Sequence, residues 1–167
     1  MRITIVQGAF LPVPPLLGGA VEKMWYELGK QFASSGHSVV HISRHFKGLP
    51  DNELIDQVRH IRIHGFNLPR NRLLLNLRDF LYSLSALRAL PTADIIVTNT
   101  FWMPILLRYG FSRCGRIIVS IERMPKGQMW LYRHVSGLRC CSNAVRRALL
   151  HEQPELASKS IIIPNFL

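Results

Sequence analysis

The sequence predicts an α/β fold, a Rossmann-like doubly wound parallel sheet in one domain over residues 1–167. Short apolar runs at residues 2–6, 94–98 and 116–121 suit strands that are buried on both faces. Apolar residues at helical spacing lie between such runs. Strands that alternate with helices form parallel sheets through crossover connections. Of the 167 residues 48% are hydrophobic, which is enough for one sizeable core.

The first half of the chain predicts three strands and one helix. We expect the strands at residues 2–6, 38–43 and 58–66, with loop-rich segments at 8–18 and 44–57. The helix begins at Gly19 and ends at Gly36. Its apolar residues form one buried stripe, made by Val21, Met24, Trp25, Leu28 and Phe32. The third strand carries His60, Arg62 and His64 on one face.

The second half continues the alternation. A leucine-rich helix ends before Pro91, and its apolar stripe is formed by Leu73, Leu77, Phe80, Leu81, Leu84 and Leu87. We then expect strands at 94–98, 116–121, 138–141 and 160–163, and helices at 102–109, 126–135 and 143–151. Ser142 suits the N-cap of the last helix. The sheet should therefore have six or seven strands.

The charge balance favours anionic partners. Lys and Arg number 21 and Asp and Glu 10, which gives a formal net charge of +11. The basic residues are spread along the chain without the aromatic interleaving of single-strand binders, so we expect no nucleic-acid partner. Arg70, Arg72, Arg78 and Arg88 flank the leucine-rich helix, which leaves peripheral contact with an anionic membrane open.

Cysteine and histidine spacing predicts no metal centre. Cys114, Cys140 and Cys141 have no metal or redox spacing, and a reduced, cytoplasmic chain is the simplest interpretation. His60 and His64 are four residues apart on a strand, too far for chelation without a third ligand. We expect no cofactor. No apolar run approaches the roughly 20 residues of a membrane span, so any membrane contact would be peripheral, on the inner face.

Ligands of parallel sheets gather where the strands end. Here these ends carry Asn99 after one strand, Ser120 and Glu122 around the next, and Arg123 and Lys126 just beyond. A second candidate is the loop at Gly18 and Gly19, because glycine amides before a helix N-terminus can approach a phosphate.

Three segments resemble family 4 glycosyltransferases, which have the GT-B fold. The opening "MRITIVQGAFLPVPPLLGGAVEKMWYELGKQFASSGHSVVHIS" is similar to theirs, and "CCSNAVRRALL" and "IIIPNFL" are similar to a late segment and the interdomain linker. The resemblance covers only the N-terminal, acceptor-side domain, and the C-terminal nucleotide-sugar-binding domain has no counterpart here. It implies transfer of a hexose-type sugar to an acceptor hydroxyl of a glycan or lipid-linked acceptor, retaining and metal-independent, by a domain that is inactive alone.

The resemblance also implies roles for residues. Gly18 and Gly19 would approach the donor diphosphate. Glu22 would orient this loop, because a carboxylate in contact with phosphate would repel it. Many relatives have a histidine near the end of the 116–121 strand, where this chain has Ser120 and Glu122.

The acceptor side and the catalytic position follow from the same strand ends. Glu122 is the candidate base or orienting group, with a salt bridge to Arg123 or another cation as the alternative. Asn99 and Ser120 belong to the acceptor side. Arg123 and Lys126 either meet an acceptor phosphate or are exposed loop cations.

Two other functions stay open on the sequence. One is an NADP-binding Rossmann domain of an oxidoreductase, although the first loop is longer than a G-x-G-x-x-G turn. The other is a non-enzymatic binder of anionic surfaces. We also expect a homodimer, because a domain without its partner leaves apolar groups uncovered, namely Phe10, Leu11, Phe101, Trp102, Phe166 and Leu167.

Overall fold

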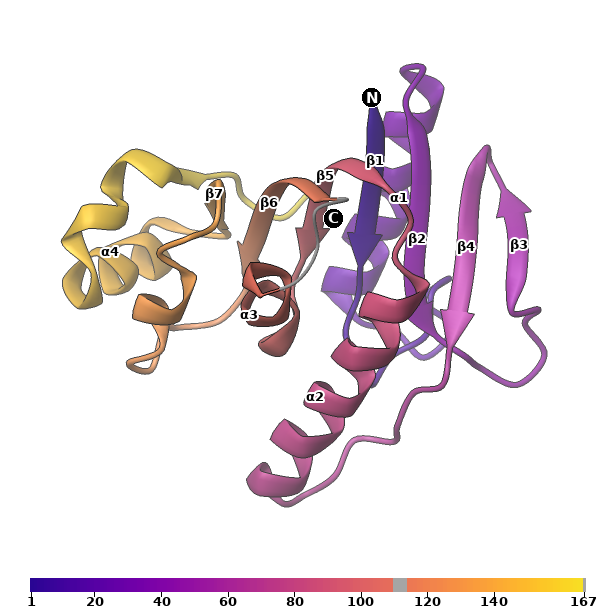
Figure 1. Ribbon diagram of the computed structural model, residues 1–167, viewed down its shortest axis with the longest axis horizontal. Coiled ribbons are helices and arrows are strands. Elements are labelled where there is room, and N and C mark those ends of the chain that lie inside the picture. The colour runs from indigo at the N-terminus through magenta and orange to yellow at the C-terminus, as the bar shows by residue number, and fades with distance from the viewer. Residues whose placement is uncertain (110–113, 167) are drawn as a thin grey trace.

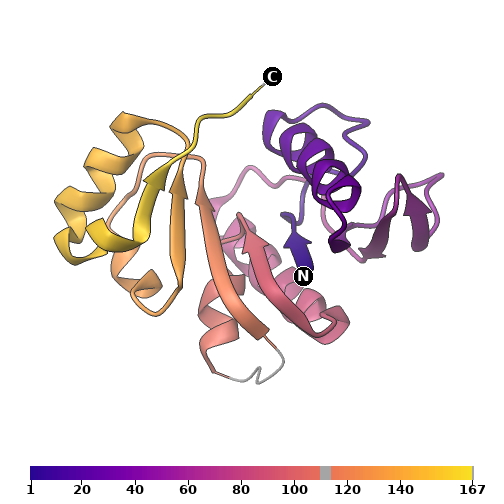
Figure 2. The ribbon, with the colours of Figure 1, turned by 90° about the horizontal axis from the view of Figure 1, so that it is seen from above.

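The computed structural model describes residues 1–109 and 114–166, which form one mainly parallel sheet with helices on both faces (Figures 1 and 2). The order of the eight strands in this part of the chain is β3-β4-β2-β1-β5-β6-β7-β8. Their bounds are β1 Arg2–Val6, β2 Ser38–Arg44, β3 Asn52–Ile55, β4 Val58–Ile63, β5 Ala93–Thr98, β6 Cys114–Ile121, β7 Gly137–Cys140 and β8 Ser160–Ile162. The α-helices are α1 Ala20–Ser34, α2 Arg72–Ala89, α3 Trp102–Arg108 and α4 Asn143–Glu152. The predicted fold class is confirmed.

Strand β3 is an addition to the predicted sheet. Residues 44–57 were expected to be loop-rich, yet β3 pairs antiparallel with β4 and makes an eighth strand. Asp56 and Gln57 join the two with φ of 48° and 65°, the left-handed backbone of a tight hairpin. Every other strand pair is parallel.

The helix predicted at 126–135 is wrong. Only a short 3-10 helix, η1, forms at Met129–Tyr132. Gly127 before it has a φ of +87°, outside the helical region. The carboxylate of Glu152 on α4 accepts hydrogen bonds from the backbone N–H groups of Gly127 and Met129, at 2.6 and 3.2 Å. The left-handed backbone of Gly127 interrupts a helix over 126–135, and the Glu152 carboxylate holds the segment in this conformation.

The core has a layer on each face of the sheet. On one face, Met24 and Trp25 of α1 pack against Ile3 and Ile5 of β1. The other face is covered by α2 and α3, with Tyr82 fully buried against the sheet. Farther along that face, η1 and α4 cover β6 and β7.

Helix α2 buries a different face from the one its leucines predicted. Its buried residues are Asp79, Tyr82, Ser83 and Ala86, whereas Leu73, Leu77 and Leu81 are exposed. Of the predicted stripe, these three leucines point away from the core, Phe80 and Leu84 are half-buried, and Leu87 packs against the core. The Asn71 side chain caps the helix by accepting hydrogen bonds from the N–H groups of Leu73 and Leu74.

Strand order also locates the opening of the fold. Strand β1 lies between β2 and β5. The next strands along the chain are therefore added first on the β2 side of β1 and later on its β5 side. In such sheets a crevice forms at the carboxyl ends of the strands at this switch point.

Candidate functional site

A cleft of about 680 Å³ lies at the carboxyl ends of β1, β5 and β6. Its walls are the start of α1, the inner side of α2 and the segment that follows β6. Seven residues predicted from the sequence line this cleft: Gly19, Glu22, Asn99, Ser120, Glu122, Arg123 and Lys126. Gly18 lies one residue outside the lining and is exposed.

The glycine loop and Glu22 form one unit at the start of α1. Gly18 and Gly19 have φ of +78° and +102°, a backbone that favours glycine. A Cβ on Gly19 would lie 2.2 Å from Glu22 Oε2 and 2.9 Å from Leu11 Cδ1. The Glu22 carboxylate therefore folds back over the glycine, and the site has no room for a larger residue.

Glu22 is close to one acidic and one basic residue of the cleft, and both affect its pKa. Burial raises the pKa of Glu22, and the nearby Glu122 raises it further. A hydrogen bond from its own backbone N–H and the positive charge of Arg123 act in the opposite direction and lower that pKa. The net shift is upward.

Glu122 is held by Arg139, a residue that the sequence analysis did not single out. Arg139 Nη1 lies 2.6 Å from Glu122 Oε1, and both side chains are almost buried, at 6% and 10% exposure. The Ser120 hydroxyl donates to the same carboxylate oxygen at 2.6 Å and accepts from Arg139 at 3.0 Å. The cationic partner of Glu122 is thus Arg139 and not Arg123.

The sequence feature that could have identified Arg139 is a charged residue in a short, otherwise apolar strand. Its register partner on β6 is Ser120, so the two side chains share one face of the sheet. Arg139 Nη2 also donates to Asn165, directly after the last strand. One buried guanidinium therefore connects the cleft with the segment that leaves the sheet.

Two acceptor atoms of cleft residues are buried without a hydrogen-bond partner among the described residues. They are Glu122 Oε2 and Asn99 Oδ1. The amide nitrogen of Asn99 donates to the buried Gln7 at 3.1 Å, which orients the amide group. Buried acceptors without partners are costly, and a ligand hydroxyl can satisfy them.

Asp79 is a second residue that the sequence analysis missed. It lies on the inner side of α2 with 6% exposure and accepts from the N–H groups of Phe101 and Trp102 at 3.2 and 3.3 Å. Burial raises its pKa to about 6, against the effect of these two hydrogen bonds. The sequence feature that could have identified Asp79 is a single carboxylate in a leucine-rich helix.

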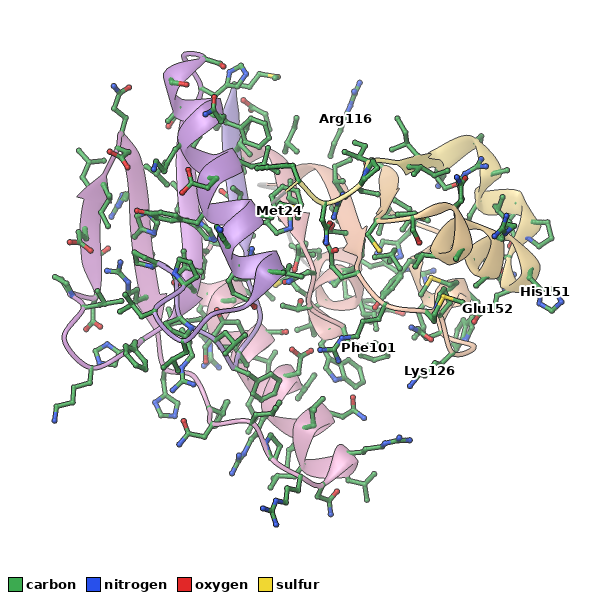
Figure 3. All side chains as sticks on the ribbon, turned by 180° about the vertical axis from the view of Figure 1, so that it is seen from behind. Met24, Phe101, Arg116, Lys126, His151 and Glu152 are labelled. Carbon is green, nitrogen blue, oxygen red and sulfur yellow. The ribbon has the colours of Figure 1, made fainter. Side chains whose placement is uncertain are left out.

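Arg123 and Lys126 are exposed at the mouth of the cleft. Within residues 1–109 and 114–166, neither side chain forms an ion pair. Figure 3 shows Lys126 and the nearby Glu152, which accepts from the adjacent backbone and fixes this segment. Two cations without an ion pair in the described residues thus stand beside the cleft, whereas the deeper Glu122 is paired with Arg139.

The sequence model of Glycosyltransferase Family 4 matches residues 17–167. The chain belongs to glycosyltransferase family 4. No curated protein sequence matches the chain at a significant level.

Solved structures agree with the family on the fold. Sucrose-phosphate synthase from Thermosynechococcus elongatus superposes with a TM-score of 0.71 at 18% identity, over 98% of this chain and 48% of its own. Starch Synthase IV from Arabidopsis thaliana gives 0.67 at 13% identity, over 99% of this chain and 51% of its own. A protein described as trehalose-6-phosphate from E. coli gives 0.61 at 12% identity, over 99% of this chain and 49% of its own. This family 4 domain has the fold of the N-terminal half of a GT-B enzyme and spans about half the length of these chains.

The remaining features of this glycosyltransferase domain concern metals, membranes and exposed apolar groups. In the described part of the chain, no three His, Cys, Asp or Glu residues lie close enough together to hold a metal ion. No described helix is both long and apolar enough to cross a membrane. Of the apolar groups expected to be uncovered, Phe166 is 50% exposed. Phe10, Leu11, Phe101 and Trp102 are half-buried, and Leu167 lies outside the described residues.

Proposed function

We propose that this domain forms the acceptor side of a retaining, metal-independent glycosyltransferase that uses a nucleotide sugar. An acceptor hydroxyl attacks the anomeric carbon of a hexose-type sugar, and the nucleoside diphosphate leaves. The acceptor is a glycan or a lipid-linked molecule. The nucleotide and most of the donor site belong to a C-terminal domain.

The observation that carries this proposal is the pair of buried acceptors in the cleft, Glu122 Oε2 and Asn99 Oδ1, which lack hydrogen-bond partners in the described residues. Sugar and acceptor hydroxyls are donors of the kind that these atoms need. The cleft is also large enough for a small-molecule ligand. In a family 4 fold this combination supports sugar transfer.

Each side of the cleft has its own part in the proposal. The amides around Gly18 and Gly19 receive the donor diphosphate, and Glu22 keeps that loop in place. Glu122, held by Arg139, orients the acceptor hydroxyl together with Asn99 and Ser120. Arg123 and Lys126 bind a phosphate of the acceptor.

Two of the similar structures support a nucleotide donor. The Starch Synthase IV structure is bound to ADP and acarbose, and the E. coli structure to UDP-2-fluoro glucose. By itself, the chain described here supplies one wall of an interdomain site. We therefore expect no turnover of nucleotide sugars by the chain alone, because one domain cannot assemble a transition state built between two.

The NADP alternative is disfavoured by Arg44, the basic residue at the end of β2. Its guanidinium donates to the carbonyl oxygens of Phe10 and Phe66 at 2.8 and 2.9 Å. A side chain engaged in this way is not free to bind a 2′-phosphate.

The proposed diphosphate loop is tested by calorimetry with UDP and ADP on two glycine variants. Gly18→Ala and Gly48→Ala are matched, because both glycines are exposed, have φ of +78° and +88°, and would leave an added Cβ with no other atom within 4 Å. We expect Gly18→Ala to weaken binding about tenfold, which is roughly 1.4 kcal/mol, and Gly48→Ala to leave it unchanged. Equal affinities in both variants, or tighter binding of NADP than of UDP and ADP, would overturn the proposal.

A further inference from the structure

The outward side of α2 is a leucine surface that the fold does not use. Leu73, Leu77 and Leu81 are 80%, 52% and 44% exposed and lie four residues apart, on one side of the helix. Leu74 of the same helix extends this surface, at 38% exposure. We call these four residues the leucine face.

The leucine face contributes little to the core. The core contacts of α2 come from the opposite side, where Tyr82 and Ala86 are fully buried. Figure 1 shows that the first turns of α2 extend beyond the sheet. Exposed apolar patches of this kind mark interaction sites.

Arginines border the leucine face in the segment that carries it. Arg70 and Arg72 lie at the start of α2 and Arg88 near its end, all exposed. Arg78 lies along its side, over the ring of Phe66 at 5.7 Å. Between residues 68 and 92 the sole acidic residue is Asp79, which is buried on the inner side and caps α3. The surface is therefore both apolar and positively charged.

We propose that the leucine face docks on an anionic lipid bilayer. The helix would lie in the plane of the interface, with its leucines at the acyl boundary and its arginines at the lipid phosphates. Charge complementarity favours this partner, because the basic border matches an anionic headgroup layer. Protein interfaces instead centre on aromatic anchors, and the leucine face contains none.

Docking of the leucine face on a membrane would also position the cleft. Arg72, Leu75 and Asn76 of the same helix line the cleft, so docking holds the cleft beside the membrane surface. This consequence rests on the proposed sugar transfer and would bring the cleft to a lipid-linked acceptor. The docking itself does not depend on any enzymatic activity.

The test is flotation of the full chain with phosphatidylcholine vesicles that contain or lack phosphatidylglycerol. The main variant is Leu73→Gln/Leu77→Gln/Leu81→Gln, since Gln is nearly as good a helix former as Leu. The control is Leu54→Gln/Ile161→Gln, which changes residues that are 73% and 58% exposed on β3 and β8. We expect the wild type and the control to bind anionic vesicles, with some binding retained in 1 M salt, where charges are screened within about 3 Å. The leucine variant should bind at least tenfold less at both salt concentrations.

Several results would overturn the docking. They are equal binding by the wild type and the leucine variant, no binding of the wild type to anionic vesicles, and binding that salt abolishes completely. A dimer in light scattering that the leucine variant dissociates would show that a second copy covers the face. If circular dichroism shows that the leucine variant is unfolded, Arg70→Gln/Arg88→Gln replaces it. That variant must lose low-salt binding by at least fivefold, and unchanged binding contradicts the proposal.

Discussion

Arg139 and Glu122 form an almost buried ion pair at the floor of the cleft, with 6% and 10% of their side chains exposed. Burial removes water from both charges, so each needs the other to remain ionised at low cost. Ser120 supports the pair through hydrogen bonds to both partners. The pair therefore positions the carboxylate that we assign to the acceptor.

Replacing only Arg139 should lower the free energy of unfolding more than replacing both Arg139 and Glu122. We expect Arg139→Met to lower the free energy of unfolding by about 3 kcal/mol, because Glu122 is left buried without a cation. The double variant Arg139→Met/Glu122→Met should recover about half of that loss. Urea unfolding of the three proteins measures both values, and a cost below about 1 kcal/mol for the single variant would contradict the account.

A second buried polar pair lies under α1. The rings of His41 and His60 stack with their centroids 5.4 Å apart, and none of their nitrogens has a hydrogen-bond partner among the described residues. Burial lowers the pKa of His41 well below its ordinary value, and the charges of His60 and Arg62 lower it further. Burial and Arg62 lower the pKa of His60 to about 4.

These histidines should make the fold sensitive to acid. Between pH 6.5 and about 4 the unfolded chain binds protons that the folded chain does not, so stability is complete above pH 6.5 and falls as the pH drops toward 4. We expect His60 to account for a loss of about 2 kcal/mol between pH 7 and pH 5, and His41 to add to that loss. Urea unfolding of His41→Leu/His60→Leu at the two pH values should show a much smaller loss. An equal pH dependence in that variant and the wild type would assign the effect to other groups.

At the scale of elements, the Glu152 side chain holds the segment between β6 and β7. Glu152 accepts from two backbone N–H groups and holds the segment that carries Lys126. Met129 is buried, and a buried backbone donor that loses its acceptor carries a penalty. The conformation of this cleft wall therefore depends on α4.

Glu152→Ala should loosen this wall. We expect a loss of about 1–2 kcal/mol in stability and faster hydrogen exchange at the amides of Gly127 and Met129. The matched control is Glu155→Ala, whose ion pair with Arg133 is half exposed and worth less than about 1 kcal/mol. Unchanged exchange at both amides in Glu152→Ala would show that other groups hold the segment.

The elements also show which features local sequence can predict. Strands β1, β5 and β6 were predictable because buried parallel strands are apolar along their whole length. Strand β3 was not, because its four residues are exposed or half-exposed and are held by pairing with β4. The apolar positions of α2 were predictable, but the exposure of Leu73, Leu77 and Leu81 was not, because small and polar residues such as Ser83 and Asp79 fill the buried side.

The same distinction holds for the site. Strand ends and the Gly19–Glu22 spacing predicted seven of the residues that line the cleft. Arg139 and Asp79 depend on contacts across the sheet and between helices, which no local pattern specifies. Register and helix packing determine these contacts, and both are properties of the whole fold.

At the scale of the whole molecule, the cleft lies at the carboxyl ends of the strands, and we propose that a second domain closes it. The proposed diphosphate loop, the Glu122 carboxylate and two cations at the mouth meet there. The leucine face lies on the outer side of the same helix that borders this cleft. The proposed transfer site and the proposed membrane surface therefore border the same helix.

The most direct test of the central claim is amide shift mapping of the ¹⁵N-labelled chain during titration with UDP-glucose and ADP-glucose. We predict weak binding with shifts at Gly18, Gly19 and the first residues of α1, and at Asn99 and Glu122 in the cleft. The amide of Arg116, at the opposite end of β6, should not move (Figure 3). Shifts confined to residues outside the cleft, or none up to saturating nucleotide sugar, would contradict the claim that this cleft receives the donor.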